Sequence, residues 1–247
     1  MARNDTFLIN ELNIDKDTKV LDIGGAMKQH EQIKVDTLVD IIFPQEAPYT
    51  ASKLKAKRFV KVDITKEKLP FKNKEFDVCL CTHTLEDLYN PFLVIEEMNR
   101  VAKRGYIATP SMGTDMIFSH FDITDWLTGG RRVPGQSHHK WFFVKDGKKM
   151  KIIPKNYAIL YSPKFHMVEW KGEVELEYYW KDKIEYYAVS DLNIHDLINE
   201  YQNFIKENRS YIRFGRVLYY YDNPFYVTKA LLKLLIKRGV GYKFRKR

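Results

Sequence analysis

The chain has 247 residues, of which 45% are hydrophobic and 30% charged, which is typical of one large globular domain and excludes a wholly disordered chain. No apolar run approaches the ~20 residues that a membrane-spanning helix needs, and acidic residues near the amino terminus argue against a signal peptide. Two cysteines exclude a disulfide scaffold and fit a reducing compartment, so we expect a cytoplasmic protein.

The net charge of +9 is concentrated at the carboxyl terminus. Residues 224–247 contain eight lysines and arginines and no acid, so the remaining 223 residues carry a net charge of only +1. The main body therefore gives no charge argument for a nucleic-acid groove. Residues 224–238 predict a basic amphipathic helix, which either packs on the domain or holds the protein peripherally on an anionic membrane surface at its cytoplasmic face. Nucleic acid is the less favoured anionic partner.

The first half of the chain alternates short apolar runs with helical or loop segments. Strands are predicted at residues 19–25, 36–42, 58–64, 76–82 and 105–110. A helix is predicted at residues 90–100, with Pro91 in its first turn. This alternation predicts an α/β fold with a Rossmann-like, doubly wound, mainly parallel sheet.

The second half predicts β-hairpin and carboxyl-terminal helical elaborations of that fold. After an irregular segment, hairpins are predicted at residues 141–153, turning at Asp146-Gly147, and at residues 174–189, turning at 181–183. A helix is expected from Ser190 or Asp191 to residue 208, and a last one from 224 to 238.

The absence of a clean linker in the sequence favours a single domain over residues 1–247. Within it we expect a cofactor-binding core at 19–111, a substrate region at 112–189, and carboxyl-terminal helices with the basic tail at 190–247.

Acids and glycines follow three predicted strands, at the edge where open α/β sheets bind ligands. Gly24 and Gly25 follow Asp22 in a turn where glycine lets the backbone approach a nucleotide closely, although the turn alone also fits a purely structural role. Asp40 ends the next strand, where its carboxylate can accept both ribose hydroxyls of a nucleoside. Asp63 ends the third strand, where it can bond an adenine amino group.

In their order and spacing these motifs resemble the class I S-adenosylmethionine-dependent methyltransferases, in the branch called methyltransferase type 11. The likeness covers about residues 19–111, through Asp22-Ile23-Gly24-Gly25, Val39-Asp40, Val62-Asp63-Ile64, Leu69-Pro70-Phe71, Phe76-Asp77-Val78, Leu85-Glu86 and Gly105-Tyr106-Ile107. It implies a methyltransferase with S-adenosylmethionine as cofactor. It also implies cofactor contacts from Asp22, Gly24, Gly25, Asp40, Asp63, Ile64, Thr82 and His83.

Three departures from the family pattern stand out. Ala26 occupies a position where the family usually has glycine, and Asp87 one where histidine is frequent. The span from Asp22 to Asp40 is also shorter than usual, so the helix after the first strand must be short or absent. A non-catalytic binding or scaffold protein on a degenerate methyltransferase fold is therefore an alternative function.

Methyl transfer requires alignment of the acceptor and, for hydroxyl acceptors, removal of a proton. The candidate bases are His83, Asp115, His120, His138 and His139. We predict His138 and His139, beside Trp141, as the catalytic pair, with a surface or structural role as the alternative for each.

We expect no metal site. Cys79, Cys81 and His83 face one way along a strand, but successive ligands at that spacing lie ~7 Å apart, so the cysteines belong to the core. The acceptor is expected to be a small molecule or a glycan. A nucleic-acid methyltransferase recruited by the basic tail is a further alternative, disfavoured because Thr82-His83-Thr84-Leu85 replaces the motif of exocyclic-amine methylation.

Overall fold

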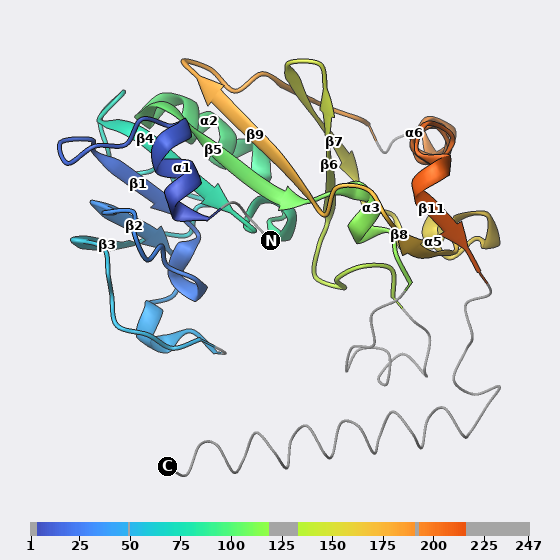
Figure 1. Cartoon of the computed structure of the whole chain (residues 1–247), viewed down its shortest axis with the longest axis horizontal. Helices are drawn as coiled ribbons and strands as arrows, with labels where there is room; N and C mark the ends of the chain where they lie inside the picture. The colour runs from blue at the N-terminus through green and yellow to red at the C-terminus, as the bar shows by residue number, and fades with distance from the viewer. Residues whose placement is uncertain (1–3, 49, 119–132, 191–192, 216–247) are drawn as a thin grey trace, which may run out of the picture.

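The computed structural model describes residues 4–48, 50–118, 133–190 and 193–215 (Figure 1). Its centre is a six-stranded sheet in the order β3-β2-β1-β4-β5-β9. These strands are β1 (Val20–Ile23), β2 (Thr37–Asp40), β3 (Arg58–Lys61), β4 (Phe76–Thr82), β5 (Ala102–Pro110) and β9 (Glu175–Lys181). The first five pair in parallel and β9 runs antiparallel to β5, which confirms the predicted mainly parallel sheet.

Helices cover the two faces of this sheet (Figure 1). On one face, α1 (Asp5–Glu11) buries Leu8 against alternate residues of β4 such as Val78 and Leu80. On the other, α2 (Pro91–Val101) packs against the intervening residues Cys79 and Cys81. Both thiols are fully buried, so their predicted place in the core is confirmed. The short helix α1 had no counterpart in the sequence prediction.

The connection from β1 to β2 contains no α-helix, as the short spacing from Asp22 to Asp40 predicted, and the described part of the connection from β2 to β3 also lacks one. Between β1 and β2 the chain forms only the 3-10 turn η1 (Gly25–Met27), and between β2 and β3 only η2 (Pro44–Glu46), residue 49 lying outside the description. The chain proceeds from β1 outward to β3 and then returns to β4 on the other side of β1. The strand order therefore reverses between β1 and β4, and ligands of such sheets bind beyond the carboxyl ends of the strands at that point.

The second half builds smaller units beside the end of β5. The predicted hairpin is confirmed as β6 (Trp141–Asp146) and β7 (Lys149–Pro154), and β10 (Tyr186–Ala188) pairs in parallel with β7. A second small sheet joins β8 (Met167–Trp170) to β11 (Ile212–Phe214). The helices are α3 (Met112–Asp115), α5 (Tyr157–Leu160) and α6 (Ile194–Glu207), with the 3-10 turns η3 (Leu85–Asp87), η4 (Pro163–Phe165) and η5 (Arg209–Tyr211). These units share an apolar cluster that includes Met112, Phe142 and Tyr201.

The predicted second hairpin is wrong. The predicted strand at 174–180 is present as β9 at Glu175–Lys181, but it extends the central sheet because its alternate residues Leu176, Tyr178 and Trp180 join the main core. The following strand, β10, pairs with β7 instead. The helix predicted from Ser190 or Asp191 begins later, where the Asn193 side chain accepts a hydrogen bond from the backbone of His195.

His120 and residues 224–238, where the sequence predicts a basic helix, lie outside the described residues. Among the residues that are described, no helix is both long and apolar enough to cross a membrane.

Candidate functional site

The turn after β1 lies against the segment after β4. Gly24 has a φ of 78°, and a Cβ at this position would lie 2.2 Å from Thr84 Oγ1. Its N–H donates to Val39 O at 2.8 Å, which ties the turn to β2 as well. Glycine is therefore required both by the backbone conformation and by the close approach of Thr84. Thr82, predicted beside the cofactor, lies half-buried at the end of β4, and its carbonyl accepts a bond from Thr84 Oγ1 at 3.1 Å.

Asp22 is a buried carboxyl group beneath this turn. Its side chain touches the backbone at Gly25, where an added Cβ would lie 2.0 Å from Oδ2. Its Oδ1 atom has no hydrogen-bond partner among the described residues. Burial raises the pKa of Asp22 to about 6, and the neighbouring Asp40 carboxylate adds to the rise while His30 opposes it.

Asp40 holds the η1 turn in place. One carboxylate oxygen accepts the Ala26 N–H at 3.0 Å, and the other accepts the N–H groups of Ile41 at 2.7 Å and Ile42 at 3.3 Å. A carboxylate has about four acceptor positions, so three are in use and one remains. The predicted bond to both ribose hydroxyls thus requires at least one of these backbone bonds to be shared or released.

Asp63 lies one strand further out and belongs to a local turn. Its carboxylate accepts hydrogen bonds from Thr65 and forms an ion pair with Lys66 at 2.8 Å. The hydrogen bond from Lys66, followed by that from Thr65, lowers the pKa of Asp63 to about 2. Ile64 beside it is 8% exposed. The predicted adenine contacts of both residues remain predictions.

The residues at the β1 edge nevertheless fit a nucleoside-bearing cofactor. The two glycines let Thr84 and Asp22 pack directly against the turn, and Oδ1 of Asp22 is an acceptor without a partner among the described residues. Asp22, Gly24, Gly25 and Asp40 are brought together here, and the bond from Val62 N to Asp40 O at 3.1 Å connects the segment before Asp63 to Asp40.

His83 joins β4 to β9. It has a φ of 51°, in the left-handed region, and its ring nitrogens lie 3.2 Å from Glu175 Oε1 and 3.4 Å from Glu86 Oε1. The hydrogen bond to Glu175, followed by that to Glu86, raises the pKa of His83 to about 9. His83 is therefore an imidazolium at neutral pH and is a poor candidate for a general base there.

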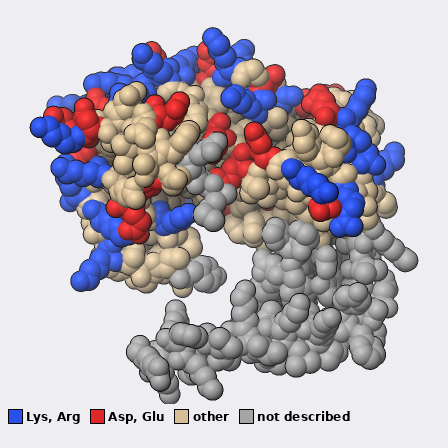
Figure 2. All heavy atoms as spheres, viewed as in Figure 1, with Lys and Arg blue, Asp and Glu red and all other residues tan. Residues whose placement is uncertain are grey.

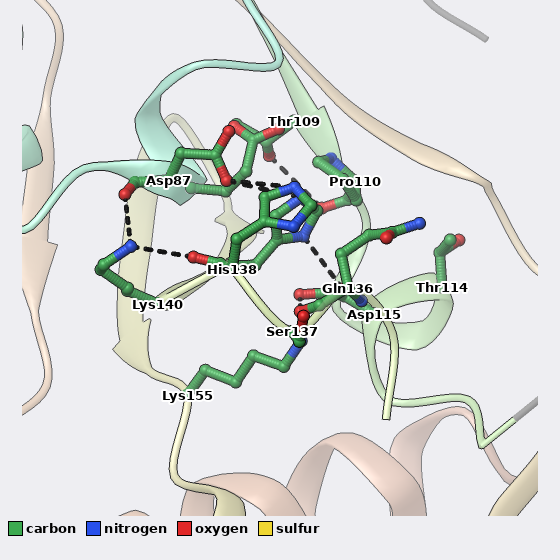
Figure 3. A network of polar contacts seen from close by, with 12 residues as sticks. Asp87, Thr109, Pro110, Thr114, Asp115, Gln136, Ser137, His138, Lys140 and Lys155 are labelled. Atoms are coloured by element: carbon green, nitrogen blue, oxygen red, sulfur yellow. Dashed lines mark hydrogen bonds and ion pairs between the residues drawn. The ribbon is translucent and has the colours of Figure 1, made fainter. Parts of the chain in front are cut away.

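A second polar cluster lies beyond the ends of β4 and β5 (Figure 3). It contains the predicted pair His138 and His139, together with Asp87 from η3 and Asp115 from α3. His139 is buried, and its Nδ1 lies 3.0 Å from Asp115 Oδ1. Its Nε2 lies 3.7 Å from Asp87 Oδ1, and Nε2 of the exposed His138 lies 3.6 Å from the same oxygen.

An ion pair with Lys155 holds Asp115 in position. The Lys155 ammonium is wholly buried and donates to Asp115 Oδ2 and to Gln136 O, both at 2.9 Å (Figure 3). Burial lowers the pKa of Lys155, although Asp115 opposes the change. The Gln136 N–H also donates to Asp115 Oδ1 at 3.0 Å. The result is a carboxylate that is held rigidly and that orients the His139 ring.

A large groove of about 980 Å³ lies beside these clusters, between β9 and the unit of β8 and α6. Its lining contains the four glutamates Glu173, Glu175, Glu177 and Glu207. Two lysines, Lys145 and Lys171, also line it, as do aromatic rings including Trp170 and Tyr211. Acidic side chains gather on this face near the start of β9 (Figure 2).

Sequence reasoning found both histidines and Asp115 but missed their partners. Asp87 was noticed only as a departure from the family pattern, and nothing in the sequence connected it to a histidine pair 51 residues later. Lys155 follows an apolar strand, where a single lysine is usually solvated. Its burial depends on the β6–β7 hairpin bringing it beneath Asp115.

Residues 22–108 match the family described as "Methyltransferase domain". A 55-residue stretch is 51% identical to an uncharacterized protein of Methanocaldococcus jannaschii and covers 22% of this chain and 27% of that protein. The chain thus spans about a quarter of that relative.

Similar solved structures include a putative methyltransferase from an antibiotic biosynthesis pathway of Anabaena variabilis. It is 14% identical, with a TM-score of 0.38, over 56% of this chain and 61% of that one. Another is a SAM-dependent methyltransferase from Aquifex aeolicus, which is 21% identical, with a TM-score of 0.33, over 47% and 66% of the two chains. The family match covers the segment that forms β1 to β5 and the turn at Gly24. Residues 22–108, about a third of the chain, are therefore similar to the methyltransferase domain family, which implies S-adenosylmethionine as the cofactor.

Proposed function

We propose that this protein transfers a methyl group from S-adenosylmethionine to a small-molecule or glycan acceptor. The observation that carries the proposal is the cluster of Asp87, His138 and His139, which lies just past β4 and β5 of the methyltransferase domain. The cofactor supplies a methyl group activated on a sulfonium. The acceptor's lone pair forms the new bond to carbon while the carbon–sulfur bond breaks, its electron pair staying on sulfur. The remaining requirement is removal of the acceptor proton, which this cluster supplies.

The groove supports the class of acceptor. Aromatic rings such as Trp170 and Tyr211 offer flat apolar faces, and the four glutamates are acceptors for hydroxyl groups. Its volume of about 980 Å³ is at the upper end of ordinary ligand pockets, which are about 300–1,000 Å³. Because glutamates outnumber lysines in the lining, a polyanion such as nucleic acid is a poorer fit.

Contacts through His83 connect the groove to the cluster of Asp87, His138 and His139. Glu175 lines the groove and contacts His83, which in turn contacts Glu86, the residue before Asp87. An acceptor in the groove is therefore one short chain of contacts away from the cluster that handles its proton.

The test is methyl transfer from deuterated-methyl S-adenosylmethionine to separated fractions of sugars and glycans, small metabolites, oligonucleotides and protein, read by mass spectrometry. We expect label in the glycan or small-molecule fraction, lost in the His138→Gln variant and retained in His195→Gln, which changes an exposed histidine on α6. Calorimetry with S-adenosylhomocysteine is run beside it. Cofactor binding without transfer to any fraction would favour a scaffold protein, and label in oligonucleotides would overturn the acceptor class.

A further inference from the structure

Three side chains in the described part of the chain place oxygen and nitrogen atoms of metal-binding type close together. The donor atoms of Asp87, His138 and His139 all lie within 4.8 Å of one another. Asp87 Oδ1 is 3.6 Å from one imidazole nitrogen and 3.7 Å from the other. These separations exceed hydrogen-bond distances of about 2.7–3.2 Å. They are close to the ~3.4 Å between two ligands that each lie about 2.1 Å from a tetrahedral ion.

The Asp87 side chain is 40% exposed, but the carboxylate oxygen that faces the two imidazoles is buried. This Oδ1 atom receives no hydrogen bond from the described residues. The Lys140 ammonium donates instead to the backbone carbonyls of Asp87 at 2.7 Å and His138 at 2.9 Å. A buried carboxylate oxygen that faces two imidazole nitrogens is satisfied by a cation bound between them.

The outer contacts of His139 are those of a metal ligand. Its Nδ1 is bonded to Asp115 Oδ1 at 3.0 Å, which directs Nε2 toward Asp87. Asp115 is itself held by Lys155 Nζ at 2.9 Å and by the Gln136 N–H at 3.0 Å. Metal-bound histidines typically donate their second ring N–H to a carboxylate that is fixed in this way.

We propose that Asp87, His138 and His139 bind a divalent transition-metal ion. Two imidazoles and one carboxylate favour ions such as Zn²⁺ over Mg²⁺ or Ca²⁺, which prefer sites made only of oxygen. Three protein ligands leave at least one position open for water or an acceptor atom. His138 is the ligand nearest to solvent, with 58% of its side chain exposed, and gives the ion a path into the site.

The consequence for methyl transfer rests on the proposed function, whereas metal binding does not. An acceptor hydroxyl that reaches the open position would lose its proton to water more readily, because the ion's charge stabilises the resulting oxyanion. The two histidines then act as ligands, and neither has to serve as the free base that the sequence predicted.

The experiment is a calorimetric titration of Zn²⁺ into the full chain, without a histidine tag and after removal of metals by a chelator. Co²⁺ absorption in the visible provides a second readout of the ligand set. We expect one Zn²⁺ per chain, with affinity reduced at least tenfold by His138→Gln and by Asp87→Asn. Because His138 is exposed, its replacement leaves folding intact, as circular dichroism will verify. The His195→Gln control should bind as the parent does.

Absence of stoichiometric binding would overturn the proposal, as would unchanged affinity in His138→Gln or an equal loss in His195→Gln. Full methyl transfer by the chelator-treated protein would overturn the catalytic consequence alone. Zn²⁺ binding in a protein that transfers no methyl group to any fraction would instead overturn the proposed function and leave the metal site standing.

Discussion

The buried Asp22 carboxyl group predicts an unusual dependence of stability on pH. Its pKa is raised from 3.8 to about 6 in the folded protein. Between these values the unfolded chain has lost the proton while the folded chain keeps it, so stability falls as pH rises. The difference of about 2 pKa units corresponds to about 3 kcal/mol of stability, which is fully present below pH 3.8 and is lost as the pH rises through 6.

Replacing Asp22 with asparagine removes this titration. Burying the amide has its own cost, about 1–3 kcal/mol for donors left without partners, but that cost does not vary with pH. We therefore expect the free energy of unfolding of Asp22→Asn to rise relative to the parent by about 2 kcal/mol between pH 4 and pH 7.

Urea unfolding, followed by tryptophan fluorescence at a series of pH values, measures this difference. The slope is the diagnostic quantity, since the absolute offset between the two proteins depends on how the amide is accommodated. If the two stability curves run parallel from pH 4 to pH 7, Asp22 titrates normally and the account of its burial is incorrect.

Three further outcomes are expected. Asp40→Ala should weaken S-adenosylhomocysteine binding ~10- to 100-fold in calorimetry. Asp17→Ala should not weaken it, because Asp17 precedes β1 and lies at the other end of the strands. Gly24→Ala should lower the free energy of unfolding in urea by more than ~2 kcal/mol, because of the positive φ and the clash with Thr84. Adding Thr84→Ala should restore only the part of that loss that comes from the clash. His83, with its pKa raised from 6.5 to about 9, should contribute stability below pH 6.5 that is lost through pH 9. Because 40% of its side chain is exposed, we expect a loss of only ~1 kcal/mol, absent from His83→Gln, when unfolding is compared at pH 6 and pH 10.

The sequence predicted the central sheet well because its signals are local. The run that forms β4 (Phe76–Thr82) is apolar throughout, and the structure buries its alternate residues on both faces of the sheet. The missing helix after β1 followed from the number of residues available before Asp40. Both inferences use only residues that are adjacent or nearly adjacent in the chain.

The same local reasoning failed at β9. Its alternation of Leu176, Tyr178 and Trp180 marks a half-buried strand, and the nearest strand along the chain was the obvious partner. The strand pairs instead with β5, about 70 residues earlier, because at that position its apolar side chains pack into the main core. Alternation identifies which residues face inward, but the partner strand is chosen by tertiary packing.

The candidate site residues are divided between the matched segment and the rest of the chain. Residues matched to the methyltransferase family supply the glycine turn, Asp22 and Asp40, and of the second cluster they supply only Asp87. The later segments supply His138, His139 and the supporting Asp115 and Lys155. Under the proposed function, the acceptor site therefore needs α3 and residues 133–155 in addition to the matched segment. The family match therefore does not identify the acceptor, because the groups that we propose to handle it come almost entirely from outside residues 22–108.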